Sequence, residues 1–337
     1  MAFLVRFGLV FVLLAALSAG GVYGYATHWA ASPLPVTEPV VVELLPGGTL
    51  AGFAAELKAA GVLRSDWLFT AYARWKGAAG RIQAGEYRVV PGETPDKLLA
   101  DLVAGTVVTY DIRIVEGSTV MRVIEQLADT PKLVDDIGRT SAETLMEQLN
   151  LGDGHAEGQF FPDTYGYKKG TRASDILLRA YERMRTVLAR EWANRADGLP
   201  YATPQDALIM ASIIEKETGR EDERGKIARV FVSRLQRQMR LQTDPTVIYG
   251  LGNSFDGNLT RANIEADDNP YNTYRLFGLP PTPIALPSLA SIQAALHPDD
   301  GDYLYFVARG DGTSEFSATL DQHLAAVRRY QLDGRVL

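Results

Sequence analysis

Residues 203–219 read TPQDALIMASIIEKETG, and this stretch predicts the helix around which the fold is built. Thr203 is a favourable N-cap, Pro204 suits the first helical position, and Gly219 is typical of a helix exit. At about 100° per residue, the apolar side chains fall on one arc of the helix, comprising Ala207, Met210, Ile213 and Ile214. The pattern indicates an amphipathic helix whose apolar face packs against a core.

Two carboxylates lie on different sides of this predicted helix. Glu217 falls inside the apolar arc, whereas Glu215 lies about 160° away at its rim, where we expect it to face mostly solvent. A carboxyl group against apolar walls has a raised pKa, so it stays protonated near neutrality and can act as a general acid. Glu217 is therefore a candidate catalytic residue. The structural alternative is a carboxylate paired with an arginine of the next helix, for example Arg224.

Regular patterns continue on both sides of this segment. Amphipathic periodicity predicts helices over about 174–194, 203–218 and 222–239, and a Gly/Pro/Asn-rich stretch then runs to residue 288. A connection of that length is usually functional. The end of the chain predicts a β-hairpin, YLYFVARGDGTSEFSA from Tyr303, and a helix over about 320–332. We therefore expect an α+β fold in which residues 128–337 form a mixed, mostly helical domain that carries Glu217.

A strand–turn–helix pattern occurs three times before that domain. The copies are VELLPGGTLAGFAAEL from Val42, YRVVPGETPDKLLADL from Tyr87 and IRIVEGSTVMRVIEQL from Ile112. Each has a glycine for the turn and a threonine at the N-cap position, namely Gly47, Gly92 and Gly117 with Thr49, Thr94 and Thr119. These copies predict a small α/β repeat domain over residues 40–127. The second copy resembles the LysM carbohydrate-binding module, which implies that this domain binds glycan.

The N-terminal part of the chain differs in composition from the rest. Residues 7–26 contain no charge, and about 20 apolar helical residues cover a hydrocarbon core of roughly 30 Å. We interpret residues 7–29 as a transmembrane anchor after a short N-terminus of residues 1–6. A cleaved signal peptide is the alternative, but its apolar region is shorter, and Tyr23, Tyr25 and Trp29 lie where an interfacial aromatic belt is expected. The Pro-rich residues 30–39 predict a linker, so a truncated protein starting near Val40 should fold.

Charge and composition narrow the function classes. Arg6 is the only basic residue before the apolar run, which predicts a cytoplasmic N-terminus and an exported body. A net charge of −7 argues against nucleic-acid binding. The chain has no cysteine, so disulfides, a lipid-modified cysteine and a thiolate nucleophile are excluded. Its four histidines have no metal-ligand spacing, so we expect neither metal nor cofactor; they are His28, His155, His297 and His323.

Four long blocks, taken together, resemble one family. They are EGQFFPDTYGY from Glu157, ASIIEKET from Ala211, LQTDPTVIYGLG from Leu241 and PYNTYRLFGLPPTPI from Pro270. In this order they are similar to the signature blocks of the endolytic murein transglycosylase (YceG-like) family, over nearly the whole chain. In lytic transglycosylases the catalytic acid is a helical glutamate followed by serine or threonine. That pattern falls on Glu217 and Thr218, the position that the helical periodicity also indicates.

The resemblance implies a reaction and a place for it. It implies a lyase that cleaves the bond between N-acetylmuramic acid and N-acetylglucosamine in peptidoglycan and leaves 1,6-anhydromuramyl ends. One glutamate first protonates the bridging oxygen and then deprotonates the 6-hydroxyl of the muramyl sugar. It further implies a single-pass protein of the bacterial inner membrane, with its catalytic domain outside the cytoplasm. There it would trim or terminate nascent strands, in cooperation with peptidoglycan synthases.

Residue type supplies candidates for substrate binding near these blocks. Aromatic faces stack on sugar rings, and amide, hydroxyl and carboxylate groups pair with sugar hydroxyls. The candidates are Glu157, Asp163, Gln242, Asp244, Tyr249, Tyr271, Asn272 and Tyr274. The alternatives are turn chemistry for the asparagine and the aspartates, core packing for the tyrosines, and a local salt bridge for Glu157.

Two other functions remain open from the sequence. A non-catalytic cell-wall scaffold would bind glycan through the repeats and use its carboxylates structurally. A hydrolytic, muramidase-type glycosidase would need a second carboxylate about 5–10 Å from Glu217. A cleft containing Glu217 would distinguish an enzyme from the scaffold.

Overall fold

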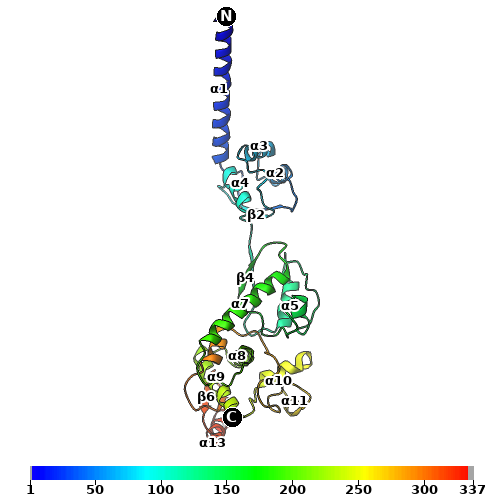
Figure 1. Ribbon diagram of the computed structural model, residues 1–337, viewed down its shortest axis with the longest axis vertical. Helices are drawn as coiled ribbons and strands as arrows, with labels where there is room; N and C mark the ends of the chain where they lie inside the picture. The colour runs from blue at the N-terminus through cyan, green and yellow to red at the C-terminus, as the bar shows by residue number, and fades with distance from the viewer. Residues whose placement is uncertain (1, 333–337) are drawn as a thin grey trace. The chain divides into compact units, whose positions relative to one another are not determined.

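The computed structural model describes residues 2–332, which form two compact units (Figure 1). The first contains the described residues up to Tyr110 together with Gly166–Gly170, and the second contains Asp111–Tyr165 and the described residues from Thr171 onward. Helices are combined with three two-stranded sheets in the described part of the chain, namely β1–β2, β3–β4 and β5–β6. The predicted α+β class is therefore confirmed.

The first unit consists of an apolar helix and a small α/β body. Its elements are α1 (Ala2–Ala31), β1 (Val40–Leu44), α2 (Leu50–Ala59), α3 (Asp66–Trp75), β2 (Gly85–Val89) and α4 (Pro95–Ala104). Strands β1 and β2 are antiparallel, with Val42 opposite Tyr87. Helices α2, α3 and α4 bury their apolar faces beside this pair, and the largest buried side chains there are Phe53, Phe69 and Tyr87.

Helix α1 is long and apolar enough to cross a membrane over Arg6–Ala31. A signal sequence can have the same length and composition. The segment after it differs from the predicted linker, because Ala30, Leu34 and Val36 lie in the core of the first unit. The Leu34 amide also donates to the Glu93 carbonyl oxygen (2.7 Å). The prolines that suggested a spacer favour an extended conformation for the residues before them. In an extended chain every second side chain points the same way, and in this segment Leu34 and Val36 point into the core.

The three repeated turns have the predicted local structure. Their glycines adopt positive φ angles of 77°, 85° and 72° at Gly47, Gly92 and Gly117. In each copy the threonine side chain accepts a hydrogen bond from the third helical amide. The third copy, β3 (Tyr110–Arg113) and α5 (Val120–Ala128), nevertheless lies mainly in the second unit. The chain thus divides at Tyr110 rather than at the predicted residue 127, because residues of the second unit bind the start of α5.

The second unit surrounds one buried helix. Its elements are α6 (Leu145–Gln148), β4 (Thr164–Tyr167, shared with the first unit), α7 (Ala173–Ala193), α8 (Pro204–Glu217), α9 (Glu221–Gln236), α10 (Asp244–Leu251), the 3-10 turn η1 (Gly252–Ser254), α11 (Arg261–Glu265), α12 (Leu289–Leu296), β5 (Tyr305–Ala308), β6 (Ser314–Ser317), α13 (Leu320–Val327) and the π-helical turn η2 (Arg328–Leu332). Strands β5 and β6 are antiparallel, with Phe306 opposite Phe316.

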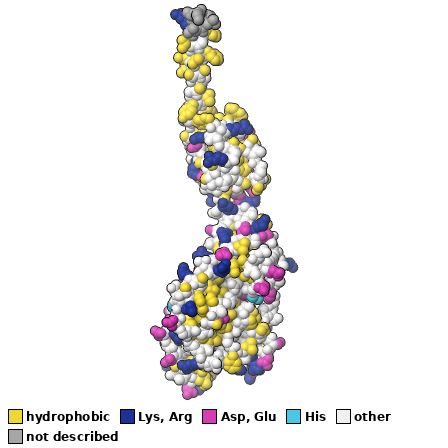
Figure 2. Space-filling model, viewed as in Figure 1, with side chains coloured by type: hydrophobic (Ala, Val, Ile, Leu, Met, Phe, Trp, Pro, Cys, Tyr) yellow, Lys and Arg dark blue, Asp and Glu magenta, His cyan; other side chains and the backbone are white. Residues whose placement is uncertain are grey.

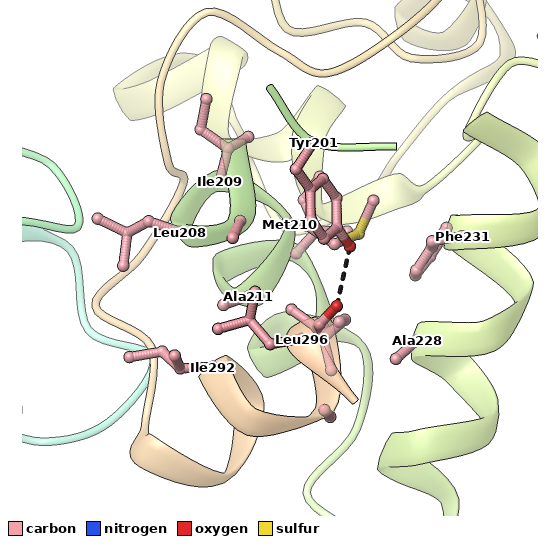
Figure 3. Close-up of a cluster of buried hydrophobic side chains, with 14 of the residues drawn as sticks. Tyr201, Leu208, Ile209, Met210, Ala211, Ala228, Phe231, Ile292 and Leu296 are labelled. Carbon is pink, nitrogen blue, oxygen red and sulfur yellow. Dashed lines mark hydrogen bonds between the residues drawn. The ribbon is translucent and has the colours of Figure 1, made fainter. Parts of the chain in front are cut away.

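Helix α8 is more deeply buried than an amphipathic pattern predicts. All eight residues from Ala207 to Ile214 are buried, including the polar Ser212, which lies one helical turn before Glu215. Figure 3 shows its side chains between those of α9 and α12, with the Tyr201 hydroxyl donating to the Ala295 carbonyl oxygen (3.2 Å). The Ser212 hydroxyl is satisfied by the Ile209 carbonyl oxygen, which makes its burial tolerable. This packing gives the last turn of α8 a defined position.

Candidate active site

Glu217 is the last residue of α8, and its side chain is half-buried. The helix begins at the predicted N-cap, Thr203, which forms a capping box with Asp206. It ends because Thr218 adopts an extended backbone conformation (φ −149°). The rigid core of α8 therefore presents a single carboxyl group at the point where the helix stops.

A buried threonine orients the Glu217 carboxyl group. The Thr243 hydroxyl donates a hydrogen bond to Glu217 Oε1. Thr243 is itself only 2% exposed, and its amide donates to the hydroxyl oxygen of Thr273 (3.1 Å), which in turn contacts the Thr246 hydroxyl (2.9 Å). Because Thr243 is the N-cap residue of α10, this hydrogen bond joins the end of α8 to the beginning of α10.

Burial raises the pKa of Glu217 to about 7. The Thr243 hydrogen bond and the charge of Arg234 oppose this rise, whereas the charge of Asp244 adds to it. A pKa near neutrality lets one carboxyl group both donate and accept a proton at physiological pH. Among the described residues, Glu217 forms no ion pair with Arg224, so the structural alternative is not realised.

Glu217 lies in a pocket of about 490 Å³ within the second unit. The pocket is lined by the end of α8, α9, the segment before α10, β5 and the C-terminal helices. Four of the predicted residues meet here, Glu217, Gln242, Asp244 and Tyr274, and they are joined by Arg234, Leu241, Phe306, Val307, Ala308, His323, Val327 and Gln331. The cleft that was expected to distinguish an enzyme from a scaffold is therefore present.

Asp244 and Tyr274 form a polar pair in this pocket. The Tyr274 hydroxyl donates to Asp244 Oδ1 (2.6 Å), which fixes the tyrosine ring relative to the start of α10. Gln242 has a positive φ of 53°, a conformation that is uncommon outside glycine. Its backbone N–H donates to the Thr273 carbonyl oxygen (3.1 Å). The same loop thus positions Gln242, Thr243 and Asp244 around Glu217.

Arg234 is a pocket residue that the sequence reasoning missed. It is 8% exposed, and its guanidinium donates to the carbonyl oxygens of Leu304 (2.8 Å) and Leu241 (2.7 Å). A weaker contact joins it to the Gln242 side-chain oxygen (3.3 Å). Its spacing in the sequence could have identified it, because Arg234 follows Ile227 and Phe231 on the buried face of α9, where charged side chains are rarely found. The sequence around Thr243 and His323 contains no comparable pattern that would have identified them as pocket residues.

Glu157 lies in a second cluster of the same unit and is 1% exposed. Its carboxylate oxygens accept from the Val120 amide (3.0 and 3.2 Å) and from the Tyr249 hydroxyl (3.2 Å). Burial raises the pKa of Glu157 to about 7, against the effect of these hydrogen bonds. The Tyr249 ring packs edge-on against Tyr271, with centroids 4.9 Å apart. Glu157 therefore caps the first turn of α5.

The remaining predicted residues also have partners within the protein. The Tyr271 hydroxyl pairs with that of Thr282 (2.8 Å). Asn272 is fully buried, and its amide nitrogen donates to the carbonyl oxygens of Ile264 (2.9 Å) and Ala266 (2.8 Å). Asp163 forms an ion pair with Arg183. These three residues, with Glu157 and Tyr249, are not among the described residues that line the Glu217 pocket.

Glu215 does not face solvent as expected. Its Oε2 accepts from the Ser288 amide (3.0 Å), the Ser288 hydroxyl (2.5 Å) and the Ser291 hydroxyl (2.6 Å). These donors lie at the N-terminus of α12, where a carboxylate is favoured by the unpaired amides and the helix dipole. The two glutamates of α8 therefore have different environments, a helix terminus for Glu215 and a pocket for Glu217.

Comparison with known proteins identifies the family of the chain. The model of the YceG-like family matches residues 42–329. An endolytic murein transglycosylase of Bacillus subtilis is 33% identical over 86% of this chain and 84% of its own length. One of Streptococcus pneumoniae is 29% identical over 88% of this chain and 60% of its own. A crystal structure of a YceG-like protein from Listeria monocytogenes, 28% identical, superposes with a TM-score of 0.52 and covers 86% of this chain and 99% of that one.

Proposed function

The chain belongs to the YceG-like family, and we propose that it is an endolytic lytic transglycosylase that cleaves peptidoglycan glycan strands. The names of the relatives from Bacillus subtilis and Streptococcus pneumoniae support this activity. The observation that carries the proposal is the environment of Glu217, a carboxyl group at the end of a buried helix, in a pocket and with its pKa near 7.

In the first step Glu217 acts as a general acid. Its proton passes to the oxygen that bridges N-acetylmuramic acid and N-acetylglucosamine, and the bond from that oxygen to the muramyl C1 breaks. The N-acetylglucosamine leaves with a new hydroxyl group, while positive charge develops at C1 and the ring oxygen. The Thr243 hydrogen bond holds the carboxyl group in one orientation during this transfer.

In the second step the Glu217 carboxylate acts as a base. It takes the proton of the muramyl 6-hydroxyl, whose oxygen attacks C1 of the same sugar and closes a 1,6-anhydro ring. Glu217 is protonated again, so one carboxyl group serves both steps and no water is consumed. Because the nucleophile belongs to the same sugar, the reaction avoids the entropic cost of capturing a second molecule.

The polar groups around Glu217 would hold the muramyl sugar. Tyr274 offers an aromatic face and Gln242 an amide, while the Asp244 carboxylate contributes negative charge near the centre that becomes positive. Arg234 keeps this wall in place through its bonds to the backbone of Leu241 and Leu304.

Asp244 also supports a second candidate function, hydrolysis by a muramidase-type mechanism. Two carboxylates in one pocket are the arrangement that glycoside hydrolases use, and Asp244 lines the pocket with Glu217. Digestion of purified sacculi followed by mass spectrometry separates the two functions. Anhydro-ended products identify the lytic transglycosylase, reducing ends identify the hydrolase, and the absence of any cleavage contradicts both.

We also propose a location for the protein and a role for its first unit. Helix α1 would anchor the chain in the bacterial inner membrane, with the N-terminus inside and the remainder outside, where it would meet peptidoglycan synthases. The mass of the protein isolated from membranes tests this, because a cleaved signal peptide would leave a chain without α1. The LysM-like copy would bind glycan at a pocket of about 350 Å³ lined by Tyr87, Arg88, Leu98 and Asp101. Retention on sacculi tests that binding.

A further inference from the structure

Helix α3 of the first unit has an apolar face that is exposed. Its buried face consists of Phe69, Thr70, Tyr72 and Ala73. On the opposite side, Trp67 is 73% exposed and Trp75 is 54% exposed, and Ala71 lies between them on the same stripe of the helix. Two exposed tryptophans eight residues apart on one helix are unusual for a surface in contact with water, because such large apolar groups mark sites of interaction.

This face is continuous with the apolar helix α1. The Trp75 ring lies edge-on to that of Tyr23, with centroids 5.6 Å apart. The Trp29 ring packs against Tyr72 in the same way, with centroids 5.7 Å apart, and Ala30 is buried in the core of the first unit. Figure 1 shows α3 beside the end of α1, and Figure 2 shows hydrophobic side chains gathered at this junction. The end of α1 is therefore fixed to the body that carries α3.

The position of Tyr23 along α1 gives the depth of this face. About 20 helical residues cross a hydrocarbon core of roughly 30 Å. A span that begins just after Arg6 therefore ends near Tyr25, which places Tyr23 at the boundary between acyl chains and headgroups. Trp75 contacts Tyr23, so it lies at the same depth, the one at which tryptophan and tyrosine are enriched in membrane proteins.

The charges beside the tryptophans fit a lipid surface. Arg64 and Arg74 flank Trp67 and Trp75, and neither forms an ion pair with any described residue. The nearby acids are already paired, Asp66 with Lys58 (2.8 Å) and Asp96 with Lys76 (3.3 Å). The net charge of the face is therefore positive, which attracts anionic phospholipid headgroups.

From these observations we propose that the exposed face of α3 lies in the headgroup layer of the membrane, with Trp67 and Trp75 inserted at its boundary. The proposal rests on α1 being a membrane anchor. The α3 face would give the first unit a second contact with the bilayer, in addition to α1. The first unit would then be held at a constant distance and orientation relative to the lipid surface.

Fluorescence of single tryptophans in the full chain tests this directly. The chain has four tryptophans, Trp29, Trp67, Trp75 and Trp192, so variants that retain only Trp67 or only Trp75 need three Trp→Phe changes each. They are placed in nanodiscs of phosphatidylcholine and phosphatidylglycerol, with bromine atoms either near the headgroup or near the end of the acyl chain. Because interfacial rings lie at headgroup depth, shallow bromines should reduce each signal by about twofold or more relative to unbrominated discs, and deep bromines should have less effect.

Three further variants make the result decisive. Val12→Trp in a chain without other tryptophans reports on α1, and deep bromines should quench it. Arg64→Glu with Arg74→Glu should weaken the quenching of Trp67, whereas Arg88→Glu, at an exposed position of β2, should leave it unchanged. If Val12→Trp is quenched while Trp67 and Trp75 are not, the α3 face lies in water and the proposal is wrong, although the anchor stands. If none is quenched, both the anchor and the α3 contact are wrong.

Discussion

The Thr243 hydroxyl donates to the Glu217 carboxyl group, and this bond connects the N-cap of α10 with the end of α8. Both helices are set by buried side chains, Ala207–Ile214 for α8 and Thr246 with Val247 for α10. The proposed acid–base group is therefore positioned by two packed elements, an arrangement that would let a single carboxyl group serve two steps of one reaction.

Glu217→Gln should abolish the formation of anhydro-ended product. The substitution keeps the size of the side chain and its contact with Thr243 but removes the titratable proton. General acid–base assistance from one group is worth roughly 10²–10⁴-fold, and Glu217 is used twice. Mass spectrometry of digested sacculi measures the product.

Glu215→Gln is the matched control two residues away. It should retain most of the activity and lower the thermal stability, because a charged cap on the N-terminus of α12 contributes roughly 0.3–2 kcal/mol. Loss of activity in Glu215→Gln, with activity kept in Glu217→Gln, would contradict the assignment of the two residues.

The role of Thr243 should be visible in the pH dependence of the reaction. In the proposed mechanism cleavage begins with protonated Glu217, so kcat/KM should fall as the pH rises through about 7. Thr243 stabilises the charged carboxylate, so Thr243→Val should raise the pKa of Glu217 and move this decline to higher pH. Loss of the orienting bond, worth roughly 1–2 kcal/mol, should also lower the rate about tenfold. Thr243→Ser restores the hydroxyl and should restore both the rate and the profile, which a purely structural role of the methyl group would not explain.

Asp244→Asn should separate the lytic reaction from hydrolysis. The asparagine keeps an oxygen for the Tyr274 hydroxyl but removes the charge that raises the pKa of Glu217. We expect anhydro-ended product to persist at a reduced rate, with the decline of kcat/KM moved to lower pH. Tyr274→Phe retains the charge and should not move the decline. If Asp244→Asn instead abolishes a product with reducing ends, the enzyme is a hydrolase.

The repeated turn and the position of Glu217 on an apolar helical face could be recognised in the sequence because each has a local cause. A glycine at positive φ and a threonine N-cap produce the same turn wherever they occur, so Gly47, Gly92 and Gly117 were identified from spacing alone. Glu217 was recognisable because a charged side chain falls on an apolar helical arc. Both signals lie within a few residues of the chain.

The environment of each carboxylate was not predictable, because it depends on residues far away in the chain. Glu215 meets Ser288 and Ser291, and Glu157 meets Val120 and Tyr249, pairings separated by 37 to 92 positions. A single sequence contains no signal for such long-range contacts. Asn272 is a different case, because its three backbone partners lie only 6 to 9 positions away, but its residue type suits both a sugar and a turn until they are seen.

The packing of residues 30–39 leads to a stability prediction. A truncated protein starting at Thr27 keeps Ala30, Leu34 and Val36 in the core, whereas one starting at Val40 loses all three. Burial of a leucine or a valine contributes about 1.5–3 kcal/mol each, so the shorter protein should be less stable by roughly 3–6 kcal/mol. Urea unfolding, followed by the fluorescence of Trp67 and Trp75, measures the difference. Equal stability would mean that these residues are a linker after all.

Glu157→Gln should make the protein more stable at alkaline pH. The folded-state pKa of Glu157 is about 7, above the value of 4.5 for an unperturbed glutamate. Between these two values the unfolded chain releases a proton that the folded protein retains, so stability falls as the pH rises from 4.5 to 7 and stays lowered above 7. This pKa difference between the folded and unfolded states corresponds to about 3 kcal/mol in the free energy of unfolding. Glutamine is neutral at every pH and can still accept from the Val120 amide, so the variant should match the wild type at pH 4.5 and exceed it at pH 8. Urea unfolding at both values measures this, and a variant that is less stable at pH 8 would show that the buried carboxylate is held in its charged form.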